Sequence, residues 1–556
     1  MNKNNLFILA LIILLAVFLR FYNLGRNPPS LTWDEAAWGY NAYSLGIDGR
    51  DEFGRFLPHD YLESFGDFKP PVYAYLSILP VKIFGLTEFS TRFASAFFGV
   101  LTVLITYFLA KILFHLRGVH SATSEVSKAE NIALLSAFFL AISPWHIMLS
   151  RAAFEANVAT FFIVCAVWLF LGGVQEKKWY LLLSAVSFVL SLYTFNTARV
   201  VAPILVLVLA IGFRKQLFKR KKQTVFAFVI GILLILPTLK FFLSPQANLR
   251  FQEVNIFSDI NIIKTTNQEI ANDNNAEWSK IIHNRRLAYG VEYLKHYFDN
   301  FNPSFLFIKG DGNPKFSTQT VGEMYLWDLP FFVIGILFLF RKREGNWWII
   351  PMWLILGIIP AATARETPHA LRIETTLPTF QIITAYGFLS FVKAISNIKY
   401  QKSKMQIKYL IFALSFLFLI FNFLYFYHDY FTHYPIRFSG EWQYGYREAI
   451  GYVKSVEHEY DRVIVTEDLG RPYIYFLFYT RYDPKRFRSE AIITREAFGF
   501  VHIKSFGKYR FGKKLNEDNN SKKALYVNIP QQVPQNAKIL KTFDLLNGNP
   551  SLVVYE

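Results

Sequence analysis

Two adjacent carboxylates, Asp34 and Glu35, stand between Trp33 and Trp38 shortly after an apolar segment near residues 6–23. Acidic side chains close to hydrocarbon are costly, so their presence beside a membrane span indicates a functional site. A carboxylate there can act as a general base or as a metal ligand. The structural alternative is helix capping, with Asp34 as the N-cap and Glu35 in the first helical turn.

Cations follow the acidic pair along the chain. Lys69 lies between Asp67 and the pair Pro70-Pro71, which stiffens the backbone, and a lysine on such a segment can hold a phosphate as a point charge. Arg92 begins the second apolar segment, where a buried guanidinium needs an anionic partner. The alternative for both side chains is a position at the lipid headgroups, with the charge in water.

Two further groups of charges lie at the ends of later apolar segments. Arg151 and Glu155 are four residues apart, so one helix face would carry both, and a simple ion pair is the alternative to substrate binding. The segment 365–372 contains His369 and Arg372. Arg372 is suited to bind an anion at the membrane surface, whereas a single loop histidine is most often only solvated.

These residues need a membrane scaffold, and the sequence predicts one. Hydrophobic residues make up 53% of the 556 residues and aromatic residues 18%. Eleven candidate spans lie near 6–23, 89–114, 131–149, 153–173, 179–196, 198–213, 224–243, 327–340, 347–364, 375–394 and 409–428. We therefore expect a polytopic α-helical membrane protein in the plasma membrane.

The net charge of +18 reports topology rather than nucleic-acid binding. Its basic residues cluster in short segments between spans, at 214–222, 341–343 and 393–408. With a cytoplasmic N-terminus on an uncleaved first span, the positive-inside rule places all three inside. Eleven spans then place every candidate site residue on the outer face. A single cysteine, Cys165, excludes an internal disulfide.

The chain outside the spans is concentrated in three outer segments. Two are long loops, 24–88 and 244–326, and the first contains an expected interfacial helix over 72–84. The third follows a membrane domain of residues 1–435: residues 436–556 predict a small extracytoplasmic α/β domain. Its expected elements are a helix at 446–456, strands at 462–466, 525–529 and 552–555, and a helix or strand at 473–482.

Taken in order, these motifs resemble those of protein O-mannosyltransferases and aminoarabinose lipid A transferases. Trp33-Asp34-Glu35 resembles the acidic motif of their first outer loop, and Asp67-Phe68-Lys69-Pro70-Pro71 their acid followed by Pro-Pro. Arg92 to Gly99 is similar to their Arg-x-x-x-x-x-x-Gly second span, and Arg151 to Glu155 to a later Arg-x-x-x-Asp motif.

The resemblance implies a C-type glycosyltransferase fold and an inverting transfer of a sugar, a hexose such as mannose, from a polyprenyl-phosphate donor. Asp34 would be the base that deprotonates an acceptor hydroxyl of a protein, lipid or glycan, with Glu35 shaping the site. Lys69, Arg92 and Arg372 would neutralise the leaving phosphate. Glu155 departs from the family's aspartate.

Phe68 stands where some relatives have a metal-binding acid, so no metal or other cofactor is expected to be required. The α/β tail differs from the β-trefoil domain of the protein mannosyltransferases. Two alternatives stay open. A transporter or flippase for lipid-linked sugars is disfavoured, since the charges lie at span ends rather than at mid-span. A ligase or polymerase for lipid-diphosphate glycans differs mainly by lacking the Asp-Glu motif.

Overall fold

The computed structural model describes residues 2–115, 123–244, 247, 255–396, 402–496, 501–513 and 523–556. Its chain forms two compact units, each built from segments far apart in the sequence. The first unit comprises Met1–Leu19, Gly99–Met148 and Ala156–Phe426. The second comprises Arg20–Phe98, Leu149–Glu155 and Tyr427–Glu556. The predicted boundary near residue 435 stays a prediction.

Long apolar helices identify a multi-pass membrane protein. Among the described residues, five helices are long and apolar enough to cross a membrane: α1 (Lys3–Phe21), α4 (Glu88–Phe114), α7 (Glu155–Gln175), α11 (Lys221–Phe242) and a helix over Leu410–Arg437 that includes most of α21 (Lys402–His428). A sixth span results if α5 (Thr123–Ile142) and α6 (Pro144–Arg151) are counted together. They are bent by 56° at a break before Pro144, which cannot donate a helical hydrogen bond.

The five other predicted spans are also helices, but they are only 10 to 18 residues long. They are α8 (Tyr180–Leu192), α9 (Ala198–Gly212), α17 (Asp328–Lys342), α18 (Ile349–Ile358) and α20 (Thr379–Ser396). At the crossing of α17 and α20, a Cβ on Gly387 would lie 1.9 Å from the carbonyl oxygen of Phe331. Small residues allow such close approach. The number eleven stays a prediction.

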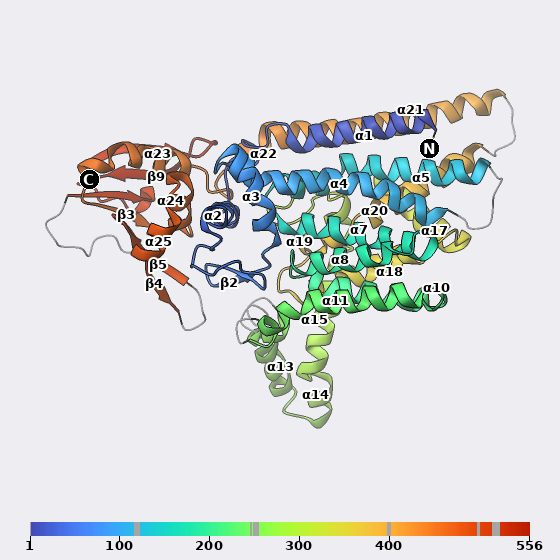
Figure 1. Ribbon diagram of the computed structural model, residues 1–556, viewed down its shortest axis with the longest axis horizontal. Coiled ribbons are helices and arrows are strands. Elements are labelled where there is room, and N and C mark those ends of the chain that lie inside the picture. The colour runs from blue at the N-terminus through green and yellow to red at the C-terminus, as the bar shows by residue number, and fades with distance from the viewer. Residues whose placement is uncertain are drawn as a thin grey trace. The chain divides into compact units, whose positions relative to one another are not determined.

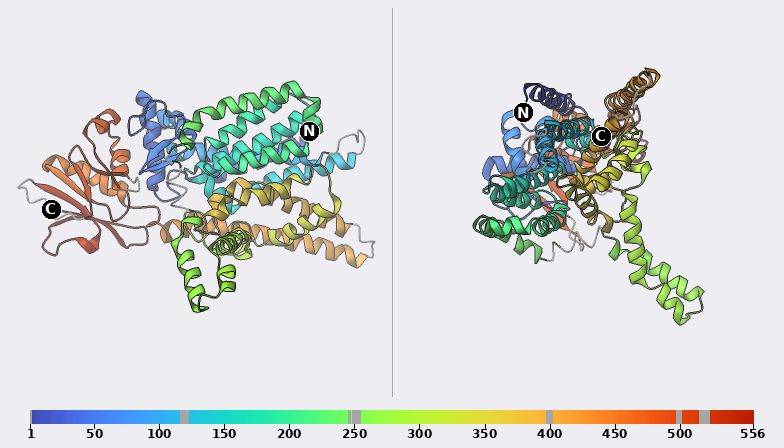
Figure 2. Two further views of the ribbon diagram at one scale, coloured as in Figure 1. Left: turned by 90° about the horizontal axis from the view of Figure 1, so that it is seen from below. Right: turned by 90° about the vertical axis from the view of Figure 1, so that its right-hand side faces the viewer.

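Residues 244–326, predicted only as a long outer loop, contain helices. The first three α-helices described there are α13 (Ile260–Asn272), α14 (Glu277–Ile282) and α15 (Arg285–Asp299), which we call the lateral hairpin. Figures 1 and 2 show it projecting to the side of the helical bundle, transverse to α11. The remaining short elements of the first unit are α10 (Arg214–Lys219), η1 (Ile256–Ser258), α16 (Pro303–Phe307), η2 (Ala361–Thr363), α19 (Ala370–Ile373) and η3 (Glu374–Thr376).

The second unit begins with the predicted first outer loop, which is ordered. It consists of α2 (Trp33–Asp48), a two-stranded hairpin of β1 (Leu62–Ser64) and β2 (Asp67–Lys69), and α3 (Val72–Phe84). Helix α3 has the predicted bounds. Phe65 and Gly66 connect the strands with φ of 61° and 86°, as the tight turn of a two-residue hairpin requires.

The C-terminal part of this unit is a mixed seven-stranded sheet in the order β4-β5-β6-β3-β7-β9-β8. Its strands are β3 (Arg462–Thr466), β4 (Ile492–Arg495), β5 (Val501–Phe506), β6 (Tyr509–Gly512), β7 (Ala524–Asn528), β8 (Ile539–Asp544) and β9 (Pro550–Tyr555). Strand β3 pairs in parallel with β6 and β7, and the other pairs are antiparallel.

Helices α23 (Tyr446–Val456), α24 (Pro472–Thr480) and α25 (Pro484–Glu490) lie beside this sheet (Figure 1). The other short elements of the unit are α22 (Tyr434–Arg437), η4 (Asp429–His433), η5 (Glu457–Glu459) and η6 (Pro530–Gln532). The predicted helix at 446–456 and the strands β3, β7 and β9 are confirmed. The segment 473–482 is mainly helical, as α24.

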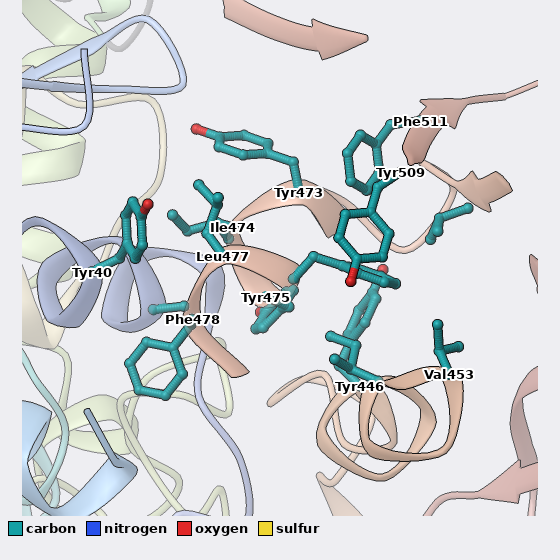
Figure 3. Close-up of a cluster of buried hydrophobic side chains, with 14 of the residues drawn as sticks. Tyr40, Tyr446, Val453, Tyr473, Ile474, Tyr475, Leu477, Phe478, Tyr509 and Phe511 are labelled. Atoms are coloured by element: carbon teal, nitrogen blue, oxygen red, sulfur yellow. The ribbon is translucent and has the colours of Figure 1, made fainter. Parts of the chain in front are cut away.

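One hydrophobic core joins the sheet, α23, α24 and α2 (Figure 3). Tyr40 of α2 faces α24, where Tyr473 to Phe478 are all buried. Gly39 permits the close approach: a Cβ there would lie 2.5 Å from ring carbon Cε2 of Phe478 and from Oγ1 of Thr91. The helix that begins with the acidic pair is therefore packed directly against the C-terminal domain.

Candidate active site

The acidic pair lies in the first turn of α2. The N-cap is Thr32, whose hydroxyl accepts a hydrogen bond from the Glu35 amide, while the Glu35 carboxylate accepts one from the Thr32 amide at 3.0 Å. This is a capping box. The predicted capping alternative is therefore wrong about Asp34: Thr32 caps the helix, and Asp34 is not needed for that purpose.

The Glu35 carboxylate is fully buried and binds Arg92. Nε of Arg92 donates to Oε1 at 2.8 Å and Nη2 donates to Oε2 at 3.2 Å. The Ala153 amide also donates to Oε1, at 2.9 Å. A buried ion pair is tolerated when further hydrogen bonds satisfy both charged groups, and both Glu35 and Arg92 have such hydrogen bonds.

Arg92 uses its remaining donors on backbone carbonyls. Its Nη1 donates to the carbonyls of Leu24 and Pro28, and its Nη2 also donates to that of Ser30. A guanidinium has five N–H donors, and all five are directed at protein acceptors. Phosphate binding was expected of Arg92, but its geometry favours a structural role: the side chain holds the loop before α2 and the carboxylate of Glu35.

Asp34 points differently from Glu35. Its side chain is 48% exposed and forms an ion pair with Nζ of Lys69, whose own side chain is 9% exposed. Lys69 ends β2, and its ammonium lies 5.3 Å from the ring centroid of Trp38 and 5.7 Å from that of Phe65. The aromatic rings hold the ammonium by cation–π contacts, so that it faces an accessible carboxylate.

Two more carboxylates act on Lys69. Burial alone would lower the pKa of its ammonium. The negative charges of Asp34, Asp67 and Glu155 outweigh burial, and this pKa lies above its usual value. The lysine is therefore positively charged at neutral pH. Three of the other predicted site residues, Asp34, Asp67 and Glu155, thus act on this one cation.

Arg151 and Glu155 do not share a helix face as predicted. Helix α6 ends at Arg151, α7 begins at Glu155, and the residues between them are not helical. Arg151 is buried and donates from Nη2 to the carbonyl of Asn27 at 2.8 Å. Its guanidinium lies 4.8 Å from the ring centroid of Phe431. Arg151 thus supports the segment before α2, while the negative charge of Glu155 acts on Lys69.

His369 and Arg372 belong to the first unit, where a buried aspartate organises their loop. Oδ2 of Asp311 accepts a hydrogen bond from the Ala370 amide at 2.7 Å, at the start of α19. His369 is buried against Phe316, with ring centroids 4.8 Å apart, and burial lowers its pKa to about 3. It is neutral at physiological pH, in contrast to the solvated histidine that the sequence suggested as the alternative.

Arg372 is half-buried and donates from Nη1 to the carbonyl of Glu366 at 3.0 Å. The sequence pattern gave no role to Asp311, although Asp-Gly-Asn is a common loop motif. The available signal was its place in a long loop predicted to lie on the outer face. Oδ1 of Asp311 also accepts from the Asn313 amide at 2.8 Å, and burial raises the pKa of this carboxyl to about 6. Asp311 is therefore the residue that fixes the Arg372 loop to residues 310–316.

Within the described ranges, no group of three or more histidine, cysteine, aspartate or glutamate side chains is arranged to hold a metal ion. Independence from metal stays a prediction.

Comparisons with known proteins agree with the resemblance found in the sequence. Residues 68–241 match the family model of dolichyl-phosphate-mannose-protein mannosyltransferase, a segment that includes Lys69, Arg92, Arg151 and Glu155. An uncharacterized protein of Aquifex aeolicus is 30% identical over 196 residues, which is 35% of this chain and 35% of the relative. The match thus spans about a third of the relative's length.

Solved structures show the fold. ArnT from Cupriavidus metallidurans in the apo state has a TM-score of 0.54 at 12% identity, covering 98% of this chain and 97% of ArnT. The same protein bound to undecaprenyl phosphate has a TM-score of 0.53 at 11% identity, with the same coverage. The chain therefore has an ArnT-like fold, and the predicted resemblance to the protein mannosyltransferase and aminoarabinose transferase superfamily is confirmed.

Proposed function

We propose that this chain is an integral membrane glycosyltransferase that transfers a sugar, a hexose such as mannose, from a polyprenyl-phosphate donor to an acceptor hydroxyl. The acceptor is a protein, a lipid or a glycan on the outer face of the plasma membrane. Two findings support the class of donor: the match of residues 68–241 to a mannosyltransferase family, and a fold shared with a protein crystallised with undecaprenyl phosphate. Basic segments between the spans support the orientation.

One observation carries the proposal: an accessible carboxylate, Asp34, faces a buried lysine on a fixed frame. A general base needs access to the proton that it removes, and Asp34 is the half-exposed member of the acidic pair. A phosphate-binding cation needs to keep its charge, and the carboxylates around Lys69 ensure that. The capping box and the ion pair of Glu35 with Arg92 hold both groups in register.

The proposed reaction is an inverting displacement. Asp34 takes the proton of the acceptor hydroxyl as its oxygen forms a bond to the anomeric carbon. The bond from that carbon to the phosphate oxygen breaks, and its electron pair stays on the polyprenyl phosphate. Lys69 and Arg372 stabilise the negative charge that develops on the leaving group. Glu35, Arg92 and Arg151 act as positioning residues.

The ion pair of Asp34 and Lys69 gives the donor a second role. A phosphate that binds the Lys69 ammonium competes with Asp34 for it. Donor binding then releases the carboxylate to accept a proton at the moment when the anomeric carbon is in place. Asp67 and Glu155 keep the ammonium charged during the exchange, and His369 stays neutral within the loop that presents Arg372.

The test is a transfer assay with purified protein in detergent. A panel of radiolabelled polyprenyl-phosphate sugars is supplied, and the release of free polyprenyl phosphate is measured. We expect one donor to turn over and Asp34→Asn to lower the rate by about 10²–10⁴-fold. Asp273→Asn is the matched control, because that aspartate lies at the end of α13 and away from the acidic pair in the sequence.

Two outcomes contradict the proposal. If Asp34→Asn turns the donor over as fast as wild type does, Asp34 is not the general base. If a donor binds without turnover, and Asp34→Asn binds it equally well, the protein is a transporter of lipid-linked sugars rather than a transferase. Dependence of binding on a diphosphate-linked glycan would favour the ligase alternative instead.

A further inference from the structure

The lateral hairpin carries an exposed apolar surface. On α15 it consists of Leu287, Val291, Leu294 and Phe298, which we call the apolar stripe. Their spacing of four, three and four residues places them on one helix face. Each is between 54% and 66% exposed. A contiguous surface of this kind marks a site of interaction.

A different face of α15 attaches the hairpin to the bundle. Tyr293 and Tyr297 lie one turn apart, and their hydroxyls donate to the carbonyls of Ile359 and Ile355, at 3.3 and 2.9 Å. Helical geometry places Tyr293 nearly opposite Val291. The apolar stripe is therefore not the surface by which α15 packs on α18.

Charged residues occupy a third face. Glu292 and Lys295 fall between the stripe and the face that packs on the bundle. The whole hairpin is balanced in charge, with five basic and five acidic side chains between residues 260 and 299. A helix with separate apolar and charged faces is the type that lies in a membrane interface.

The neighbouring helix indicates what covers the stripe. Ile355 of α18, whose carbonyl accepts the Tyr297 hydrogen bond, is itself 47% exposed and belongs to a predicted span. An exposed isoleucine on such a span faces lipid. The apolar surface of α15 thus begins beside a lipid-facing surface, and it continues sideways along the hairpin, which lies transverse to α11 (Figures 1 and 2).

The tip of the hairpin has the same character. Trp278, Ile281 and Ile282 of α14 are between 55% and 69% exposed. Tryptophan and tyrosine are the residues that favour the boundary between lipid headgroups and acyl chains, and the hairpin offers Trp278 at its tip and Tyr293 and Tyr297 at its base.

We propose that the lateral hairpin is a membrane-interface anchor, with its apolar stripe and the exposed side chains of α14 inserted at the boundary of headgroups and acyl chains in the outer leaflet. Its occupant is the lipid bilayer. Because the hairpin has no net charge, its insertion depends on apolar contact and is independent of anionic lipid. This inference does not depend on the proposed glycosyltransferase activity.

The experiment measures depth in nanodiscs of phosphatidylethanolamine and phosphatidylglycerol. In a Cys165→Ala background, full-length protein is spin-labelled at single cysteines, Val291→Cys and Leu294→Cys on the stripe and Glu292→Cys and Lys295→Cys on the charged face. Collision rates with oxygen, which concentrates in lipid, and with a water-soluble nickel complex are compared. Elution volume and circular dichroism establish that each variant is folded.

We expect oxygen to dominate at Val291 and Leu294 and the nickel complex to dominate at Glu292 and Lys295, with the same result in nanodiscs of phosphatidylcholine alone. Access of the nickel complex to all four positions would overturn the proposal, as would exclusion of both reagents from the stripe, which indicates a protein partner or a second copy. As a second measurement, brominated lipid is expected to quench the part of the fluorescence that Trp278→Phe removes. Absence of that quenching also contradicts insertion.

Discussion

Arg92 and Glu35 form a fully buried ion pair that fastens the first turn of α2 to the start of α4. Its two side chains come from segments on either side of the β1–β2 hairpin. Thus the accessible carboxylate of Asp34 and the ammonium of Lys69 are set by a frame that includes neither of them.

The first prediction concerns this pair. Arg92→Ala leaves the Glu35 carboxylate buried without a counter-ion, so we expect it to destabilise the protein by about 3–5 kcal/mol. Arg92→Lys is not expected to rescue, because an ammonium cannot supply five donors. Thermal unfolding in detergent measures the effect. A folded Arg92→Ala protein with normal stability and a weakened donor affinity would instead support phosphate binding by Arg92.

Lys69 is expected to act on donor binding. Lys69→Met removes the only charge that we assign to the phosphate from this hairpin, so KM for the donor rises, and kcat falls because leaving-group stabilisation is lost. Lys69→Arg keeps the charge and is expected to retain part of the activity. Initial rates over a range of donor concentrations separate the two parameters. Unchanged kinetics in Lys69→Met would exclude its role.

Arg372 is the second proposed phosphate ligand. Arg372→Gln should raise KM for the donor by about tenfold, the equivalent of about 1.4 kcal/mol, close to the lower end of the range for a charged hydrogen bond. Asp311→Ala should have the same effect through the loop, since it removes the acceptor of the Ala370 amide. Arg365→Gln is the control. Arg365 lies on the same loop, but its Nε donates to the carbonyl of Asn255 at 3.2 Å and we assign it no role in phosphate binding.

A pH dependence follows from Glu52, a buried carboxyl in the predicted first outer loop. Burial raises its pKa to about 8, above the value of 4.5 in an unfolded chain. The folded state therefore binds more protons between these values, and stability decreases as pH rises from 4.5 to 8. Glu52→Gln should increase the free energy of unfolding at pH 9 by a few kcal/mol and change it little at pH 4.

Denaturant unfolding at several pH values measures this effect. The amide oxygen of Glu52→Gln can still accept the Ser64 hydroxyl, which lies 3.1 Å from Oε1 of Glu52. Glu277→Gln, at a side chain that is 87% exposed, is the control and should not alter the pH profile. Equal pH profiles for Glu52→Gln and wild type would refute the prediction.

Gly39 tests the packing of α2 against α24. Gly39→Ala places a methyl group 2.5 Å from the ring of Phe478, and such overpacking costs about 1–3 kcal/mol. Gly46→Ala in the same helix meets the flexible side chain of Lys82 at 3.2 Å and Cγ2 of Ile78 at an ordinary contact distance of 3.5 Å, and it should be neutral or stabilising. Melting temperatures of the two variants compare them directly. Similar shifts for both would show that the contact is unimportant.

Much of the membrane part could be predicted from the sequence, because apolar runs have a simple physical cause. Each of the eleven predicted spans coincides with a helix, and α3 and α23 have the predicted bounds. Helices α13, α14 and α15 were missed. Their apolar residues alternate with charges, and such a pattern carries no signal for a span.

The site was only partly predictable. Residue type and position relative to the spans were sufficient to select Asp34 and Lys69, which form an ion pair. Asp34 is half-exposed and Glu35 is buried because the capping box fixes the first turn of α2. The role of Arg92 depends on backbone carbonyls that only the folded loop brings together. The break between Arg151 and Glu155 was also hidden, because both flanking segments are helical.

The packing of α2 on the C-terminal domain has a consequence for biosynthesis. The second unit combines Arg20–Phe98 with Tyr427–Glu556, so its core cannot close until the sheet has been translated. Asp34 is synthesised early, but the core that positions its helix forms late. A chain that stalls before α24 would have its membrane helices but no surface against which α2 can pack.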